Sequence, residues 1–175
     1  MQIIAILAPL AVSIFAVVWA SRASHRASAA EQEATRQRSL ADTRYKVYQP
    51  MLEIFGDMMV PARAEAALKE AEKAIPDFQT FISVWGSDEA VAAFYRFRSG
   101  SNHQPPPMIA VRLVADFLVE ARRDLAWPET KITPIEVMGM RMDKMSDELV
   151  AALTMDLEEL GAKYEWKVPW KKSRR

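Results

Sequence analysis

An uncharged apolar segment near the start of the chain constrains the fold more than any other feature. Residues 3–20 read IIAILAPLAVSIFAVVWA, and the first charged side chain in the sequence is that of Arg22. As an α-helix this segment would extend about 27 Å, close to the thickness of the hydrocarbon core of a bilayer. The sequence therefore predicts a transmembrane anchor over residues 1–21.

Basic side chains follow the apolar segment but do not precede it, which sets the predicted orientation. Arg22, Arg26, Arg36 and Arg38 lie on its C-terminal side. By the positive-inside rule, that side stays in the cytoplasm. A cleaved secretory signal is the alternative, because the apolar core ends in small residues near Ala20, but a signal carries its positive charge before that core. We therefore expect a single-pass inner-membrane protein with its N-terminus outside and its bulk in the cytoplasm.

The composition excludes several classes of functional site. The chain has no cysteine and only two histidines, His25 and His103. It therefore offers no thiolate nucleophile, no Cys-ligated metal and no histidine-rich metal site, although an all-carboxylate site stays open. Lys and Arg number 23, as do Asp and Glu, so the net charge does not indicate nucleic acid as a partner. We expect no cofactor and no metal.

The rest of the chain predicts an all-α fold. Glycine is scarce, with five residues, and the alternating apolar and polar runs typical of strands are nearly absent. Residues 22–49 are rich in Ala, Glu, Gln and Arg, which favour helix. They predict a stalk that continues the anchor until Pro50 kinks or interrupts it. We assign residues 50–165 to a cytoplasmic helical bundle and residues 166–175 to a basic tail containing tryptophan.

Two helices are predicted to form the core of the bundle. Residues 108–127 are apolar on all sides except one stripe of charged side chains, which is typical of a central bundle helix. The sequence Thr-Pro-Ile-Glu at residues 133–136 is a capping box, and Met and Leu then recur at spacings of three and four. This pattern predicts one long helix over residues 133–164. Ser87 and the two acids after it predict the start of a further helix.

Small residues recur every four positions where the anchor meets the stalk. Ala16, Ala20 and Ser24 form this face, and small side chains at that spacing let helices approach closely in lipid. We therefore predict self-association of the helix through these three residues. The alternative interpretation is that alanine is simply common in membrane anchors.

The tail combines tryptophan with basic side chains. Trp166 and Trp170 are interspersed with Lys167, Lys171 and Lys172, a composition suited to an anionic lipid surface. We predict lipid contact for these five residues. A solvated terminus is the alternative, and RNA is a further candidate ligand.

One spacing has a catalytic interpretation. Arg98 and His103 are separated by four residues, a spacing that resembles the Arg-x4–6-His pattern of HEPN-type ribonucleases, which are small helical bundles. The resemblance implies that the two side chains would act together on the 2′-hydroxyl and the scissile phosphate of RNA. However, Gly100 and the prolines that follow place His103 in a loop, whereas the family has its pair at the head of a helix. We therefore expect His103 to be an exposed loop residue and the chain not to be an enzyme.

Three segments resemble short, uncharacterised bacterial and phage membrane proteins, in which one N-terminal span precedes a small helical domain. They are RYKVYQPMLEIF, VWGSDEAVAAFYRFR and ARRDLAWPETKITPIEV. The architecture is also similar to that of the membrane accessory protein of type VI-B CRISPR systems, which has a degenerate HEPN-like pattern and assembles into a pore. The resemblance implies a homo-oligomer that forms a membrane pore or acts in antiphage defence, with a cytoplasmic protein partner. A membrane-tethered HEPN-like ribonuclease and a non-catalytic adaptor are the alternatives.

Overall fold

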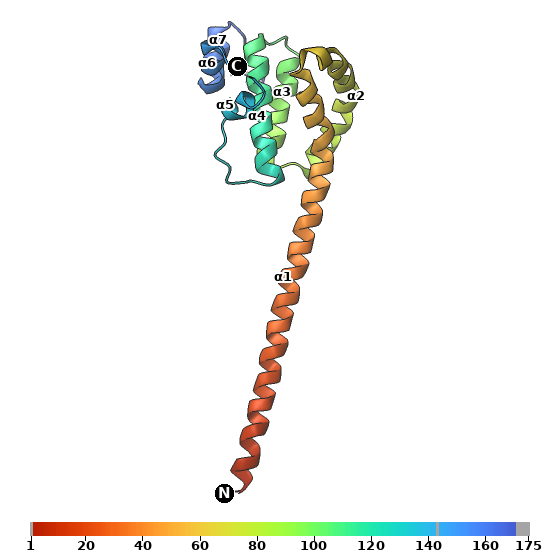
Figure 1. Ribbon diagram of the computed structural model, residues 1–175, viewed down its shortest axis with the longest axis vertical. Coiled ribbons are helices and arrows are strands. Elements are labelled where there is room, and N and C mark those ends of the chain that lie inside the picture. Colours follow the sequence, from red (N-terminus) through yellow and green to blue (C-terminus); the bar gives the residue numbers. More distant parts are fainter. Residues whose placement is uncertain (1, 143, 171–175) are drawn as a thin grey trace, which may run out of the picture. The chain divides into compact units, whose positions relative to one another are not determined.

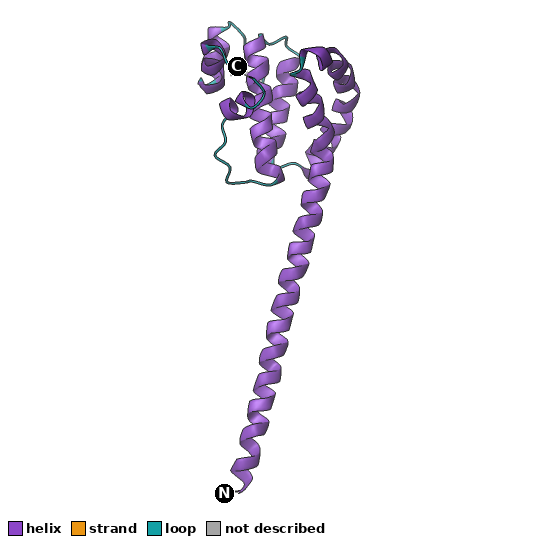
Figure 2. Cartoon of the chain, in the orientation of Figure 1, coloured by secondary structure: helices purple, strands orange, loops and turns teal. Residues whose placement is uncertain are grey.

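The structure, a computed structural model, describes residues 2–142 and 144–170, without the side chains of residues 2–27, 29, 30 and 61. These residues form helices and no strand (Figures 1 and 2), which confirms the predicted all-α class. The helices are α1 (Gln2–Met58), α2 (Pro61–Trp85), α3 (Asp88–Ser101), α4 (Pro107–Leu125), α5 (Pro134–Gly139), α6 (Asp147–Thr154) and α7 (Leu157–Lys163).

The chain divides into two compact units, residues 1–42 and residues 43–175. The first unit contains only the N-terminal part of α1, and nearly all of its described side chains are exposed. Local hydrogen bonds support the polar part of this helix, since the Glu33 carboxylate accepts hydrogen bonds from Arg36 and Gln37. The second unit contains the rest of α1 together with α2–α7, and it holds both clusters of buried apolar side chains.

The predicted membrane location is corrected by the structure. Within the part of the chain that the structure describes, none of the helices combines the length and the apolar character that a transmembrane span requires. The side chains that the structure describes in α1 before the second unit, those of residue 28 and residues 31–42, are mostly polar and exposed, so they add no apolar length to a span. The predicted single-pass, inner-membrane protein with its N-terminus outside is wrong on this finding. Ala16, Ala20 and Ser24 lie outside the described side chains, and their association stays a prediction.

Helix α1 is not interrupted at Pro50, so of the two expected effects of this proline, a kink or an interruption, the interruption is wrong. It continues to Met58, although proline cannot donate a hydrogen bond to the carbonyl one turn earlier, a loss of about 3 kcal/mol in a helix interior. Pro50 itself is exposed, while Tyr48, Met51 and Phe55 on either side of it are buried. Burial of these side chains offsets the missing bond, because packing stabilises a helix more than its local propensity does.

Helix α2 packs on the bundle along one narrow face. Ala67, Ala71, Phe78 and Ile82 recur at spacings of four, seven and four, and all four are buried. Most of the other side chains over residues 62–74 are exposed. The two buried alanines are small enough to let α2 approach its neighbours closely.

Helix α4 is the central helix, as its nearly continuous apolar surface predicts. It contacts α3, α5, α6 and α7, and eight of its residues are buried. The predicted helix start at Ser87 is also confirmed, since the Ser87 side chain accepts a hydrogen bond from Ala90 N at the start of α3. Gly100 permits the close approach of α3 to α4, because a Cβ at this position would lie 2.6 Å from Leu113 Cδ1.

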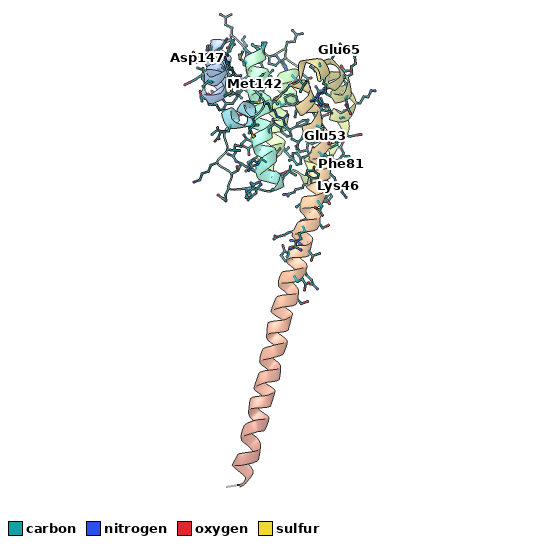
Figure 3. All side chains as sticks on the ribbon, viewed as in Figure 1. Lys46, Glu53, Glu65, Phe81, Met142 and Asp147 are labelled. Carbon is teal, nitrogen blue, oxygen red and sulfur yellow. The ribbon has the colours of Figure 1, made fainter. Side chains whose placement is uncertain are left out.

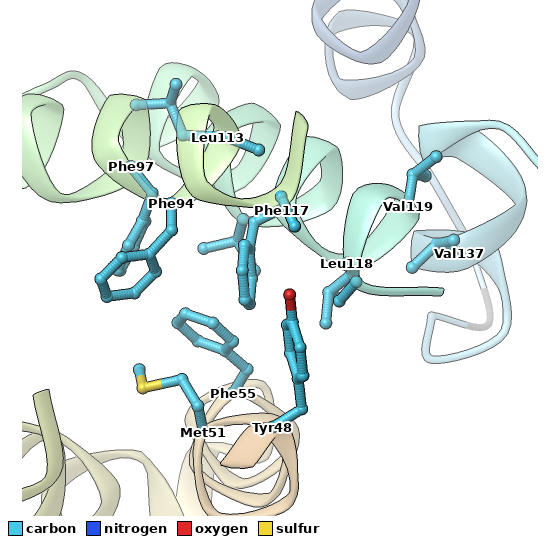
Figure 4. Close-up of a cluster of buried hydrophobic side chains, with 14 of the residues drawn as sticks. Tyr48, Met51, Phe55, Phe94, Phe97, Leu113, Phe117, Leu118, Val119 and Val137 are labelled. Carbon is cyan, nitrogen blue, oxygen red and sulfur yellow. The ribbon is translucent and has the colours of Figure 1, made fainter. Parts of the chain in front are cut away.

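Phe117 of α4 lies at the centre of an aromatic cluster (Figure 4). Its ring centroid is 6.1 Å from that of Tyr48, 5.7 Å from Phe55, 5.9 Å from Phe78 and 5.5 Å from Phe94. Three of the four pairs have edge-to-face geometry, which aromatic rings prefer to a face-to-face sandwich. The cluster joins α1, α2, α3 and α4 into one core.

The long helix predicted over residues 133–164 is instead three short helices, α5, α6 and α7. The capping box at the start of α5 is confirmed, with Thr133 and Glu136 bonded reciprocally. New helices begin because Ser146 accepts a bond from Leu149 N, and Asp156 accepts bonds from the two amides of Glu158 and Glu159. The apolar spacing survives these breaks because all three helices pack against α4.

Candidate functional site

An open apolar groove with a volume of about 630 Å³ lies on the bundle, and we call it the methionine groove. Five methionines line it: Met51, Met58, Met59, Met138 and Met142. The first three come from the C-terminal end of α1 and the loop that follows it, and the last two come from α5 and the following turn (Met142 is labelled in Figure 3). Segments about 80 residues apart in the chain therefore supply side chains of the same type to one surface.

The methionine groove is accessible as well as apolar. Met58, Met59 and Met142 are half-buried, and Leu68 on its α2 wall keeps 53% of its surface exposed. Methionine side chains are unbranched and polarisable, so a wall made of them adapts its shape to what it binds. Apart from Ser101, the one polar lining residue is Glu72, which is exposed and has no ion-pair partner among the described residues.

A second feature of the bundle is a buried carboxylate, that of Asp124 at the end of α4. Its side chain is 1% exposed and accepts hydrogen bonds from the Tyr48 hydroxyl at 2.6 Å and from Ser87 N at 3.1 Å. The Arg44 guanidinium pairs with its other oxygen at 3.1 Å. Burial, followed by the hydrogen bond to Asp124, raises the pKa of Tyr48 well above its usual value. This network joins α1, α3 and α4, so its evident role is structural.

Arg112 makes a comparable connection between α4 and α6. Its Nη1 donates to the carbonyls of Ala152 and Met155 at 3.0 and 2.6 Å, and its Nε donates to Asp116 Oδ1 at 2.8 Å. A guanidinium suits this place because the last carbonyls of a helix lack partners within the helix. Burial raises the pKa of Asp116, and the charge of Arg112 partly counters that rise.

The two candidate catalytic residues each form a hydrogen bond with a residue near the C-terminal end of α3. Arg98 Nη1 donates to Asn102 Oδ1 at 2.9 Å, and His103 Nδ1 lies 2.8 Å from the Ser99 carbonyl oxygen. His103 is exposed in the turn after α3, where the sequence placed it. Both side chains thus have local partners, and the described contacts include none between them.

The tryptophans of the tail pack partly against the bundle. Trp166 and Trp170 are half-buried, their ring centroids lie 5.8 Å apart, and Trp166 Nε1 donates to the His103 carbonyl at 3.2 Å. Lys167 is exposed, while Lys171 and Lys172 lie outside the described residues. Part of the surface of both indole rings is therefore buried within the second unit. Lipid contact by the tail stays a prediction.

No protein-family model, curated protein or solved structure matches this chain. Sequence reasoning found the candidate pair Arg98 and His103 but missed the methionine groove and the Asp124 network. The apolar spacing around the methionines was visible in the sequence, but nothing local indicated that the two methionine segments meet.

Proposed function

We propose that this chain is a non-catalytic helical protein that acts by binding other protein chains, copies of itself among them. The observation that carries the proposal is the methionine groove. Its lining is almost wholly apolar, and it lies open on the surface. Contiguous apolar surface of this kind marks binding sites on proteins, because covering it removes apolar area from water. An adaptor is the function that suits such a surface best.

Self-association is supported by the first unit. Its described residues form one helix, and residues 3–20 of that helix carry no charged side chain. Apolar side chains of this number favour association with another apolar surface, and a second copy supplies an identical one. The small residues Ala16, Ala20 and Ser24 are the predicted contact face between two such helices.

The ribonuclease alternative has less support. A HEPN-type mechanism would direct the histidine and the arginine at one phosphate, whereas Arg98 and His103 are hydrogen-bonded to Asn102 and to the Ser99 carbonyl. Apo geometry alone does not exclude a catalytic pair, so the alternative is decided by experiment.

We expect the purified full-length chain to leave a single-stranded RNA substrate uncleaved, and Arg98→Ala and His103→Ala to change neither this result nor the oligomer mass. The reason is that neither residue lines the methionine groove or the predicted helix contact. RNA cleavage followed by gel electrophoresis, with light scattering on the same samples, measures both quantities. Cleavage by the wild-type chain that both substitutions abolish would establish the ribonuclease and contradict our proposal.

Replacing Ala20 with leucine is expected to weaken self-association at least tenfold, a change of about 1.4 kcal/mol. A branched side chain at this position would hold two helices apart where small residues allow close contact. Sedimentation equilibrium of the full-length chain over a range of concentrations gives the dissociation constant. Ala20→Ser, which keeps the residue small, is the matched control and should associate like wild type. A wild-type chain that is monomeric at every concentration would contradict self-association itself.

A further inference from the structure

We propose that the methionine groove receives the apolar segment of residues 3–20 from a second copy of the chain. This inference rests on the self-association proposed above and identifies the surface that takes part in it. The groove is open and apolar, and Glu72 is the one charged residue among the described residues that line it. These properties decide which occupant it suits.

The charge at the groove argues for a partner that is apolar and flanked by a cation. Two other acids of α1 and α2, Asp57 and Glu65, are paired with Arg63 and Lys69 respectively. Glu72 is exposed and has no such partner among the described residues. An acyl chain with a carboxylate head would place a second negative charge near Glu72 and find no basic side chain in the lining that the structure describes. A cation at the end of an apolar segment would instead be attracted.

The chain itself contains a segment of this description. Residues 3–20 carry no charge, and the first charged side chains after them are Arg22 and Arg26. Phe15, Trp19, Arg22 and Arg26 are spaced by four, three and four residues, which places them on one face of an α-helix. Two aromatic anchors are thus followed on the same face by two guanidinium groups.

This face fits the way a helix binds in a groove. Helix-in-groove complexes use apolar anchors spaced by three or four residues, and methionine-rich walls adapt to such anchors. Phe15 and Trp19 would enter the groove, and Arg22 or Arg26 would pair with Glu72. The face is also distinct from the Ala16, Ala20 and Ser24 face, which stays free to contact another helix.

The test is a charge exchange in the full-length chain, with the dissociation constant of self-association as the readout. Glu72→Arg should weaken association at least tenfold, and so should the double variant Arg22→Glu, Arg26→Glu. Combining the three substitutions should restore it to within a factor of about three of wild type. Glu70→Arg is the matched control, because Glu70 is an exposed acid on α2 that does not line the groove.

A cross-linking measurement supports the charge exchange, because the chain has no cysteine of its own. Mixing Phe15→Cys with Met142→Cys protein under mild oxidation should give an intermolecular disulfide, and mixing Phe15→Cys with Glu70→Cys should not. If Ala20→Leu dissociates the oligomer while the charge variants leave it unchanged and no disulfide forms, self-association stands and the groove is not its surface. A monomeric wild type would remove both proposals together.

Discussion

Replacing Asp124 with alanine is expected to lower the free energy of unfolding by about 3–5 kcal/mol. The carboxylate accepts bonds from the Tyr48 hydroxyl, Ser87 N and the Arg44 guanidinium, and its side chain is 1% exposed. Alanine would leave the Tyr48 hydroxyl and Ser87 N without this acceptor, and Arg44 would keep only its 3.4 Å hydrogen bond to the main-chain carbonyl of residue 124. Arg44 keeps 36% of its side chain exposed and regains some hydration, which favours the lower end of the range. Urea unfolding followed by circular dichroism measures the change.

Two further variants separate the parts of this network. Tyr48→Phe removes one hydroxyl and keeps the ring in the aromatic cluster, so we expect a loss of about 1–2 kcal/mol. The effect of Tyr48→Phe should be much smaller in the Asp124→Ala background, because the hydroxyl has then already lost its acceptor. Additive losses, or an Asp124→Ala protein that unfolds at the same urea concentration as wild type, would show that Asp124 does not connect these helices.

The sequence contained the local signals of the fold but not its long-range contacts. The capping box at Thr133 and Glu136, the Ser87 cap and the apolar surface of α4 all depend on residues within a few turns of one another. The hydrogen bond from Tyr48 to Asp124 spans 76 residues. Its local sequence marks Asp124 only as a polar residue at the end of a helix. No spacing rule relates the two positions, so only the folded bundle reveals the pair.

The division of residues 133–164 into three helices shows a different limit. Apolar periodicity reports which residues face the core, and three short helices packed on α4 preserve it almost as well as one long helix. The breaks had their own signals, since Ser146 and Asp156 are each followed by two acids within their helix's first turn. At Pro50 the sequence allowed an interruption that does not occur, because buried side chains on either side of it keep α1 continuous to Met58.

Individual residues of the candidate site could be predicted from the sequence, but their arrangement could not. Helical periodicity identifies the buried faces that carry Met51 and Met138, but it does not say that they line one groove. Arg98 and His103 were predicted as a candidate pair from their spacing alone. In the structure each of them has a local hydrogen-bond partner. The residue types in the sequence therefore indicate this site less clearly than the arrangement of α1, α2 and α5 around α4 does.

Replacing Phe117 with alanine is expected to cost about 3–5 kcal/mol, because it removes a fully buried ring and leaves a cavity at the centre of the bundle. Its ring contacts those of Tyr48, Phe55 and Phe94, so relaxation of one neighbour cannot refill the space. Phe117→Leu retains most of the volume and should cost roughly 1–2 kcal/mol.

The matched surface control for Phe117→Ala is Tyr95→Ala on α3. Tyr95 keeps 58% of its surface exposed, so its loss should change the free energy of unfolding by no more than about 0.5 kcal/mol. The midpoint of urea unfolding should therefore fall steeply for Phe117→Ala, less for Phe117→Leu and hardly at all for Tyr95→Ala, with the slope of the transition unchanged. Equal midpoints for the two alanine variants would mean that Phe117 is not the centre of the core, because only a ring surrounded on all sides by fixed neighbours leaves a cavity that the bundle cannot close.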